Sequence, residues 1–231
     1  VGVPAERMVF LHAGTDGADP LEVTRRERFD TSTAMRVAGR YALDLANIGP
    51  ADLRHVDLYS CFPSAVQIAA RELGLPETRD LTVTGGLTFA GGPWNNYVTH
   101  AVATMAERLR AEPGFGLCTA NGGYLTKHSF GVYASEPPAA GFRHLQPQDE
   151  IDRQPTVDPA GDVAGVMTLE AYTVMHDRDS TPETGLAVMR AADGRRAWAS
   201  TNDAADMREL VDTDAVGRAV ARSTGGAFRL S

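Results

Sequence analysis

The sequence predicts an α/β domain followed by a small β-barrel, because the pattern of apolar residues changes along the chain. Up to residue 135, apolar runs of strand length alternate with stretches in which apolar residues recur at helical spacing. After residue 165, short strands follow one another with a single short helix among them, which is typical of an OB-type barrel. Residues 136–164 hold five prolines among polar residues and are predicted to be a linker. The predicted domains are therefore residues 1–135 and 165–231.

Start and stop signals define the elements of the first domain. Residues 7–12 are predicted to form a buried strand that ends in the glycine-rich turn 13–17. A helix is predicted between the capping residues 30–33 and the stop at Gly49-Pro50. The other predicted strands are 55–60, 115–120 and 129–134, and the other predicted helices are 64–73 and 95–110. The expected architecture is a mixed sheet with one layer of helices.

The second domain is predicted from short alternating runs. Asp193-Gly194 is a turn signal between two such runs and predicts a hairpin. The predicted strands are 165–175, 185–191, 195–200, 216–221 and 227–230, with a helix at 203–210. We therefore expect an OB-like barrel that docks onto the rest of the protein. Nucleic acid is not expected in this barrel, because its aromatic residues are dispersed and the segment is acidic.

Composition narrows the classes of function. The chain has 231 residues and a formal net charge of −8, which disfavours nucleic acid and anionic membranes as partners. No apolar run approaches the length of a membrane span. Cys61 and Cys118 are the only cysteines and neither belongs to a CxxC motif, so we expect no metal, no disulfide and a reducing cytoplasm. The chain opens Val-Gly-Val-Pro, which favours one piece of a longer protein.

Three segments stand out as candidates for a functional site. They are Tyr59-Ser60-Cys61-Phe62, the glycine-rich run 83–93, and the run 117–123 that ends in Asn121-Gly122-Gly123. Each one follows a predicted strand or precedes a predicted helix, where the active-site loops of α/β proteins gather. Any one of these glycine segments is explained by a tight turn. Their order and spacing together indicate more than turns.

In this order and spacing the three segments resemble the C-terminal half of the thiolase superfamily over about residues 1–135. Tyr59-Ser60-Cys61-Phe62 is similar to the His-Asp-Cys-Phe loop of the sterol-carrier-protein type. The run 83–93 is similar to the family's Asn-Gly-Gly to Gly-His-Pro segment, and residues 117–123 lie where its Cys-x-Gly loop belongs. The resemblance extends to bacterial thiolase-like proteins with an extra C-terminal domain, nominally acetyl-CoA acetyltransferases of lipid metabolism.

The departures from the family pattern affect its chemistry. Gly92 stands where the family has the Gly-His-Pro histidine, which activates the nucleophile and contributes to the oxyanion hole. Asn121 stands where the family has its second cysteine, and an amide does not shuttle protons near neutral pH. The resemblance leaves Cys61 as an acid/base candidate and Tyr59 as a donor to a thioester carbonyl. The family's nucleophilic cysteine belongs to an N-terminal half that this sequence lacks.

We therefore expect a thiolase-like acyl-CoA protein whose thiolase activity is weak or absent in this chain. The resemblance implies coenzyme A or an acyl-CoA as substrate or ligand, a complementing N-terminal half in the same or another polypeptide, and a possible oligomer. The residues expected to bind substrate are Phe62, Gly91, Gly92, Pro93, Asn121, Gly122 and Tyr124. Two alternatives stay open. One is a non-catalytic acyl-CoA-binding or scaffolding subunit, and the other is a retro-aldolase that depends on Tyr59 and Tyr124.

Overall fold

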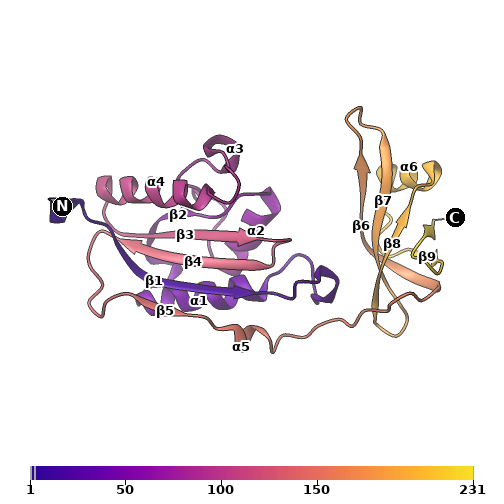
Figure 1. Cartoon of the computed structure of the whole chain (residues 1–231), viewed down its shortest axis with the longest axis horizontal. Helices are drawn as coiled ribbons and strands as arrows, with labels where there is room; N and C mark the ends of the chain where they lie inside the picture. Colours follow the sequence, from indigo (N-terminus) through magenta and orange to yellow (C-terminus); the bar gives the residue numbers. More distant parts are fainter. Residues whose placement is uncertain (1, 3, 231) are drawn as a thin grey trace. The chain divides into compact units, whose positions relative to one another are not determined.

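The chain folds into two compact units, shown in Figure 1. The structure is a computed structural model that describes residues 2 and 4–230. The first unit comprises the residues up to Leu21 together with Arg28–Gln154, and the second comprises Glu22–Glu27 together with the residues from Pro155 onward. Within the described residues, no helix is both long enough and apolar enough to cross a membrane.

A five-stranded mixed sheet forms the centre of the first unit, in the order β2-β3-β4-β1-β5 (Figure 1). Its strands are β1 (Phe10–Ala18), β2 (Leu53–Asp57), β3 (Phe115–Gly122), β4 (Lys127–Ala134) and β5 (Arg143–Leu145). The β2–β3 and β1–β5 pairs are parallel, and β4 is antiparallel to both β3 and β1. The mixed sheet predicted from the sequence is confirmed.

Helices cover both faces of this sheet, so the expected single layer of helices is wrong. The helices are α1 (Thr33–Ala46), α2 (Pro63–Glu72), α3 (Leu87–Ala90), α4 (Tyr97–Ala111) and α5 (Gln148–Ile151). Leu117 of β3 belongs to the buried cluster of α1 and α2, whereas its neighbour Cys118 belongs to the cluster of α4. Because successive strand residues point to opposite faces, α4 lies on the face opposite to α1 and α2.

The sequence predicted the boundaries of the main helices well. Ser32 caps α1 by accepting a hydrogen bond from the Met35 amide at 3.0 Å, and Pro63 occupies the first turn of α2. Asn47 ends α1 in the left-handed conformation, with φ of 62°. The helix therefore ends just before Gly49-Pro50, where the sequence predicted a stop.

The predicted glycine-rich turn at residues 13–17 is wrong, because β1 continues through these residues to Ala18. Gly14 and Gly17 are needed for close packing instead. A Cβ atom on Gly14 would lie 3.3 Å from the Phe142 ring, and one on Gly17 would lie 2.4 Å from the Ile151 side chain. These glycines let later segments of the chain pack directly against the strand.

The segment 136–164, expected as a linker, contains the short elements β5 and α5. β5 pairs in parallel with β1, and His144 and Gln146 contact the Asp16 carboxylate at 2.9 and 2.7 Å. Ile151 of α5 is fully buried among residues of α1. Residues up to Gln154 therefore belong to the first unit, and the crossing to the second unit follows at Pro155.

The second unit is a curled antiparallel sheet in the order β10-β9-β6-β7-β8. Its elements are β6 (Gly165–His176), β7 (Pro182–Arg190), β8 (Arg196–Thr201), α6 (Ala204–Asp212), β9 (Ala219–Arg222) and β10 (Phe228–Arg229). The Ser200 amide donates to the Gly226 carbonyl at 2.8 Å, and a parallel bridge joins Ser200 to Ala227. The two edges of the sheet thus meet, in agreement with the small barrel expected from the sequence.

Candidate functional site

Cys61 and Asn121 meet where the parallel strands β2 and β3 end. Cys61 lies in the loop between β2 and α2, and Asn121 is the next-to-last residue of β3. The Asn121 side-chain nitrogen lies 3.3 Å from the Cys61 sulfur, to which it donates a hydrogen bond. Cys61 itself is exposed. The first and third predicted site segments are therefore brought into direct contact.

Asn121 also carries an unused acceptor at this place. Its side-chain oxygen Oδ1 is buried and has no hydrogen-bond partner among the residues that the structure describes. Buried polar atoms are almost always paired, so an unpaired oxygen beside an exposed thiol marks a place where a ligand can supply a donor. If the Asn121 side-chain amide is rotated by 180°, its nitrogen takes the position of the unpaired oxygen, and the unpaired atom is then a hydrogen-bond donor.

Tyr59 lies two residues before Cys61, and its ring packs edge-to-face on Tyr97 at a centroid distance of 5.3 Å. Burial, together with the nearby Cys61 sulfur, raises the pKa of the Tyr59 phenol. Burial also raises the pKa of the Cys118 thiol, with the Asp57 carboxylate adding to the effect. Cys118 lies within β3 and is 3% exposed, which agrees with its predicted place in the core.

A buried carboxylate, Asp57, holds the loops of the site together, and the sequence did not indicate it. Asp57 is the last residue of β2 and is fully buried. It accepts hydrogen bonds from the Tyr97 hydroxyl at 2.8 Å and from the amides of Val83 and Thr84 at 3.0 and 3.2 Å. Burial raises the pKa of Asp57 although these donors act in the opposite direction. The available signal was a charged residue inside the run 55–60, which the sequence predicts to be a strand.

The glycine-rich run is held close to the Cys61 loop. The Leu87 amide donates to the Ser60 hydroxyl at 3.0 Å. A Cβ atom on Gly86 would lie 2.9 Å from the same hydroxyl, and Gly86 has φ of 87°, so a glycine is required there. The second predicted segment therefore lies beside the first.

The other predicted site residues are at the surface. Gly122 is half-buried and continues β3 after Asn121. The exposed members of the predicted set are Phe62, Gly91, Gly92, Pro93 and Tyr124. Their role in substrate binding stays a prediction.

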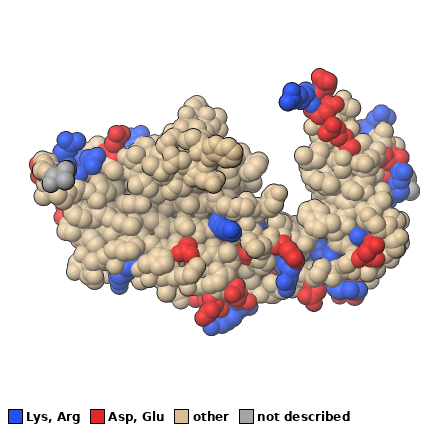
Figure 2. Space-filling model, viewed as in Figure 1, with Lys and Arg blue, Asp and Glu red and all other residues tan. Residues whose placement is uncertain are grey.

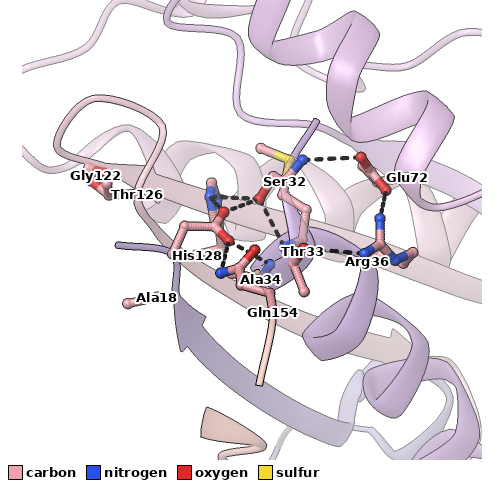
Figure 3. Close-up of polar contacts among 12 residues, drawn as sticks. Ala18, Ser32, Thr33, Ala34, Arg36, Glu72, Gly122, Thr126, His128 and Gln154 are labelled. Carbon is pink, nitrogen blue, oxygen red and sulfur yellow. Dashed lines mark hydrogen bonds and ion pairs between the residues drawn. The ribbon is translucent and has the colours of Figure 1, made fainter. Parts of the chain in front are cut away.

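Asp19, Ser32 and His128 form a buried polar cluster beside the β3–β4 hairpin. Figure 3 shows Ser32 and His128 of this cluster. Ser32 Oγ donates to the Asp19 carboxylate at 2.5 Å and lies 3.4 Å from His128 Nε2. His128 is the cross-strand partner of Asn121 in the β3–β4 ladder. The Asp19 amide also donates to the Thr126 carbonyl at 2.8 Å, which fixes the hairpin from its backbone.

Asp19, Ser32 and His128 are the residue types of a hydrolase triad, but their arrangement stabilises the fold and is not that of a catalytic site. Ser32 is 1% exposed and its hydroxyl caps α1 while donating to Asp19, so no substrate atom can reach its oxygen. In a triad the histidine lies between the carboxylate and the serine, whereas here Asp19 accepts a hydrogen bond directly from Ser32 and lies 4.0 Å from His128 Nε2. Asp19 also accepts from the Ala34 amide and the Gln154 side chain, both at 3.1 Å.

Comparisons with known proteins agree with this architecture. Residues 146–226 match the family described as the thiolase-like protein type 1 additional C-terminal domain. Among solved structures, the chain is similar to a monomeric SCP2-thiolase like protein type 1 from Mycobacterium smegmatis, with a TM-score of 0.91 and 36% sequence identity. The similarity covers 100% of this chain and 52% of that chain, so this chain spans about half the length of that protein. The comparison with curated proteins gave no significant match.

The mixed sheet, its loops at the ends of β2 and β3, and these matches define a protein of the thiolase superfamily. Within that superfamily, the chain belongs to the SCP2-thiolase-like proteins. The resemblance inferred from the three segments is thereby confirmed at the level of family and fold.

Proposed function

We propose that this protein binds the thioester group of a coenzyme A ester beside Cys61 and Asn121, with little or no thiolase activity of its own. The observation that carries the proposal is the Cys61–Asn121 pair with its unpaired, buried amide oxygen. Exposed Cys61 gives a ligand access, and the Asn121 amide offers a polar partner for a thioester or for an amide of the coenzyme A arm.

Weak catalysis follows from the residue types at the proton-handling positions. Gly92 has no side chain that accepts a proton or stabilises an oxyanion, and one such group contributes roughly 10²–10⁴ in rate. Asn121 remains neutral at all ordinary pH values, so it orients a ligand but does not transfer protons. Cys61 and Tyr59 are then the remaining candidates for acid/base chemistry in the three segments.

A complementing N-terminal half, in the same polypeptide or in another, is part of the proposal. Figure 2 shows few charged side chains on the face of the first unit that is in view. The large apolar residues exposed in this unit are Met8, Leu11, Leu21, Phe62, Phe89, Trp94, Tyr124, Phe142 and Leu145. Such a surface favours a further protein partner. Self-association, a cytoplasmic location and a place in lipid metabolism also belong to the proposal.

The test is a calorimetric titration of the complete protein with acetyl-CoA, together with an assay of thiolysis. We expect saturable binding that Asn121→Ala weakens roughly tenfold, the usual value of one hydrogen bond to a ligand. Asn202→Ala, an exposed asparagine of the second unit, is the matched control and is expected to leave the affinity unchanged. Thiolysis of acetoacetyl-CoA at the rate of an ordinary thiolase, or absence of acetyl-CoA binding, would contradict the proposal.

The structure gives the retro-aldolase alternative less support. A tyrosine that removes a proton must reach the phenolate form, and burial raises the pKa of Tyr59 away from neutral pH. Tyr124 is 82% exposed, so its phenol is not held in a water-excluded site in this unit. Loss of aldol cleavage in Tyr59→Phe with full activity in Cys61→Ala would favour this alternative over thioester binding.

A further inference from the structure

One buried arginine in the second unit uses every hydrogen-bond donor that it has. The Arg196 side chain, on β8, is 0% exposed. Its guanidinium donates to both carboxylate oxygens of Glu170, at 2.6 and 2.7 Å. It also donates to three main-chain carbonyls, those of Thr24 at 2.7 Å, Glu27 at 3.2 Å and Arg26. An arginine has five N–H donors, so all of them are occupied.

The three carbonyls belong to residues 22–27, a segment of the connection between β1 and α1 that we call the strap. A second set of contacts holds the strap from its other side. Arg26 forms a β-bridge with Thr156, and the Val157 amide donates to the Arg25 carbonyl at 2.9 Å. Thr24 and Arg26 are 8% and 5% exposed. The strap is therefore built into the second unit although the chain reaches that unit again only at Pro155.

We propose that the additional C-terminal domain is a split domain, completed by the strap. The sequence match to that domain covers residues 146–226 and leaves residues 22–27 outside. The strap supplies the partners of three donors of a guanidinium that is inaccessible in the folded unit, and a charged group is buried in this way only when it is paired. The surface around Arg196 thus fits a peptide segment that presents several main-chain carbonyls, and residues 22–27 of the same chain, which include the 3-10 turn Val23–Arg25, occupy it.

The residues on either side of the strap are also held together by hydrogen bonds. The Asp19–Ser32 hydrogen bond of 2.5 Å joins the residues on either side of the strap. Asp19 further accepts from Gln154, the last residue before the second crossing to the C-terminal domain. Both crossings are therefore anchored at one carboxylate, behind the hairpin that carries Asn121. The proposal is independent of whether the protein binds a thioester.

Limited digestion with trypsin tests the strap directly, because Arg25, Arg26 and Arg28 are potential cleavage sites in or beside it. In the full chain we expect slow cleavage there in the wild type, and cleavage on the order of tenfold faster in Arg196→Ala, because protease attack follows the population of the released segment. Arg195→Ala is the matched control. Arg195 is the neighbouring residue, is 45% exposed and pairs with Asp193 at a turn.

Equal cleavage of the strap in the wild type, Arg196→Ala and Arg195→Ala would overturn the proposal. Hydrogen exchange of β6 and β7 in the same samples shows whether the domain is folded. If Arg196→Ala does not fold, Arg196→Lys decides the question, because lysine keeps the charge opposite Glu170 but cannot span all five acceptors. We expect Arg196→Lys to be cut faster than the wild type, and an unchanged rate would equally overturn the proposal.

Discussion

Two pairs of side chains in the site, Cys61 with Asn121 and Asp57 with Tyr97, have different roles. Cys61 and Asn121 are placed to meet a ligand, since one is exposed and the other has an unpaired buried oxygen. Asp57 and Tyr97 meet no solvent, both being 0% exposed, and they hold the loop at residues 83–84 against the end of β2. The first pair is the candidate for chemistry, and the second positions it.

Replacement of Tyr97 by phenylalanine tests this positioning role. The change removes the donor to Asp57 Oδ1 and leaves that buried oxygen unpaired, so we expect a loss of about 1–3 kcal/mol in the free energy of unfolding. Urea denaturation measures this loss. Tyr41→Phe is the control, because the Tyr41 hydroxyl donates to the partly exposed carboxylate of Glu150. We expect a smaller loss in the free energy of unfolding for this variant. Equal losses in the two variants would contradict the role given to Asp57 and Tyr97.

At the scale of secondary structure, the sequence predicts local features well and long-range features poorly. Pro63 and the Ser32 cap mark helix starts, and both signals depend only on neighbouring residues. Gly14 and Gly17 were misread as a turn, because their need for close packing comes from Phe142 and Ile151, more than 100 residues away. The pairing of Cys61 with Asn121 was missed for the same reason, although both residues had been singled out.

The second unit offers a prediction about pH. Burial acts to raise the pKa of the Glu170 carboxyl, but hydrogen bonds from Arg196 and Arg190 outweigh it and hold the pKa below its ordinary value of 4.5. A lowered folded-state pKa stabilises the unit above pH 4.5, and this contribution disappears as the pH falls through the folded-state pKa. We therefore expect the difference in unfolding free energy between the wild type and Glu170→Gln to shrink on acidification.

Thermal or urea unfolding at a series of pH values from neutral to strongly acidic measures that difference. Glu183→Gln is the matched control, because it is the same change at an exposed residue of β7. A difference between the wild type and Glu170→Gln that stays constant at every pH would show that the Arg196–Glu170 contact does not depend on the charge of Glu170.

For the whole molecule, family membership and chemistry have to be considered separately. The chain has the SCP2-thiolase-like fold and matches about half the length of its solved relative. The three segments singled out in the sequence contact one another near the ends of β2 and β3, whereas the resemblance implies proton-transferring residues at the positions of Gly92 and Asn121. The family was predictable from the order and spacing of three motifs. The activity was not, because the three motifs do not include the nucleophile that the resemblance implies.

The two cysteines allow the most direct test of the central claim, which places the thioester beside Cys61. Alkylation of the complete protein with iodoacetamide, followed by mass spectrometry, measures the rate at each cysteine with and without acetyl-CoA. Cys118 is the internal control, because it is 3% exposed and burial raises the pKa of its thiol. Of these two cysteines, we expect only Cys61 to react, and acetyl-CoA to slow its reaction. Alkylation of Cys61 at the same rate in saturating acetyl-CoA would contradict the account.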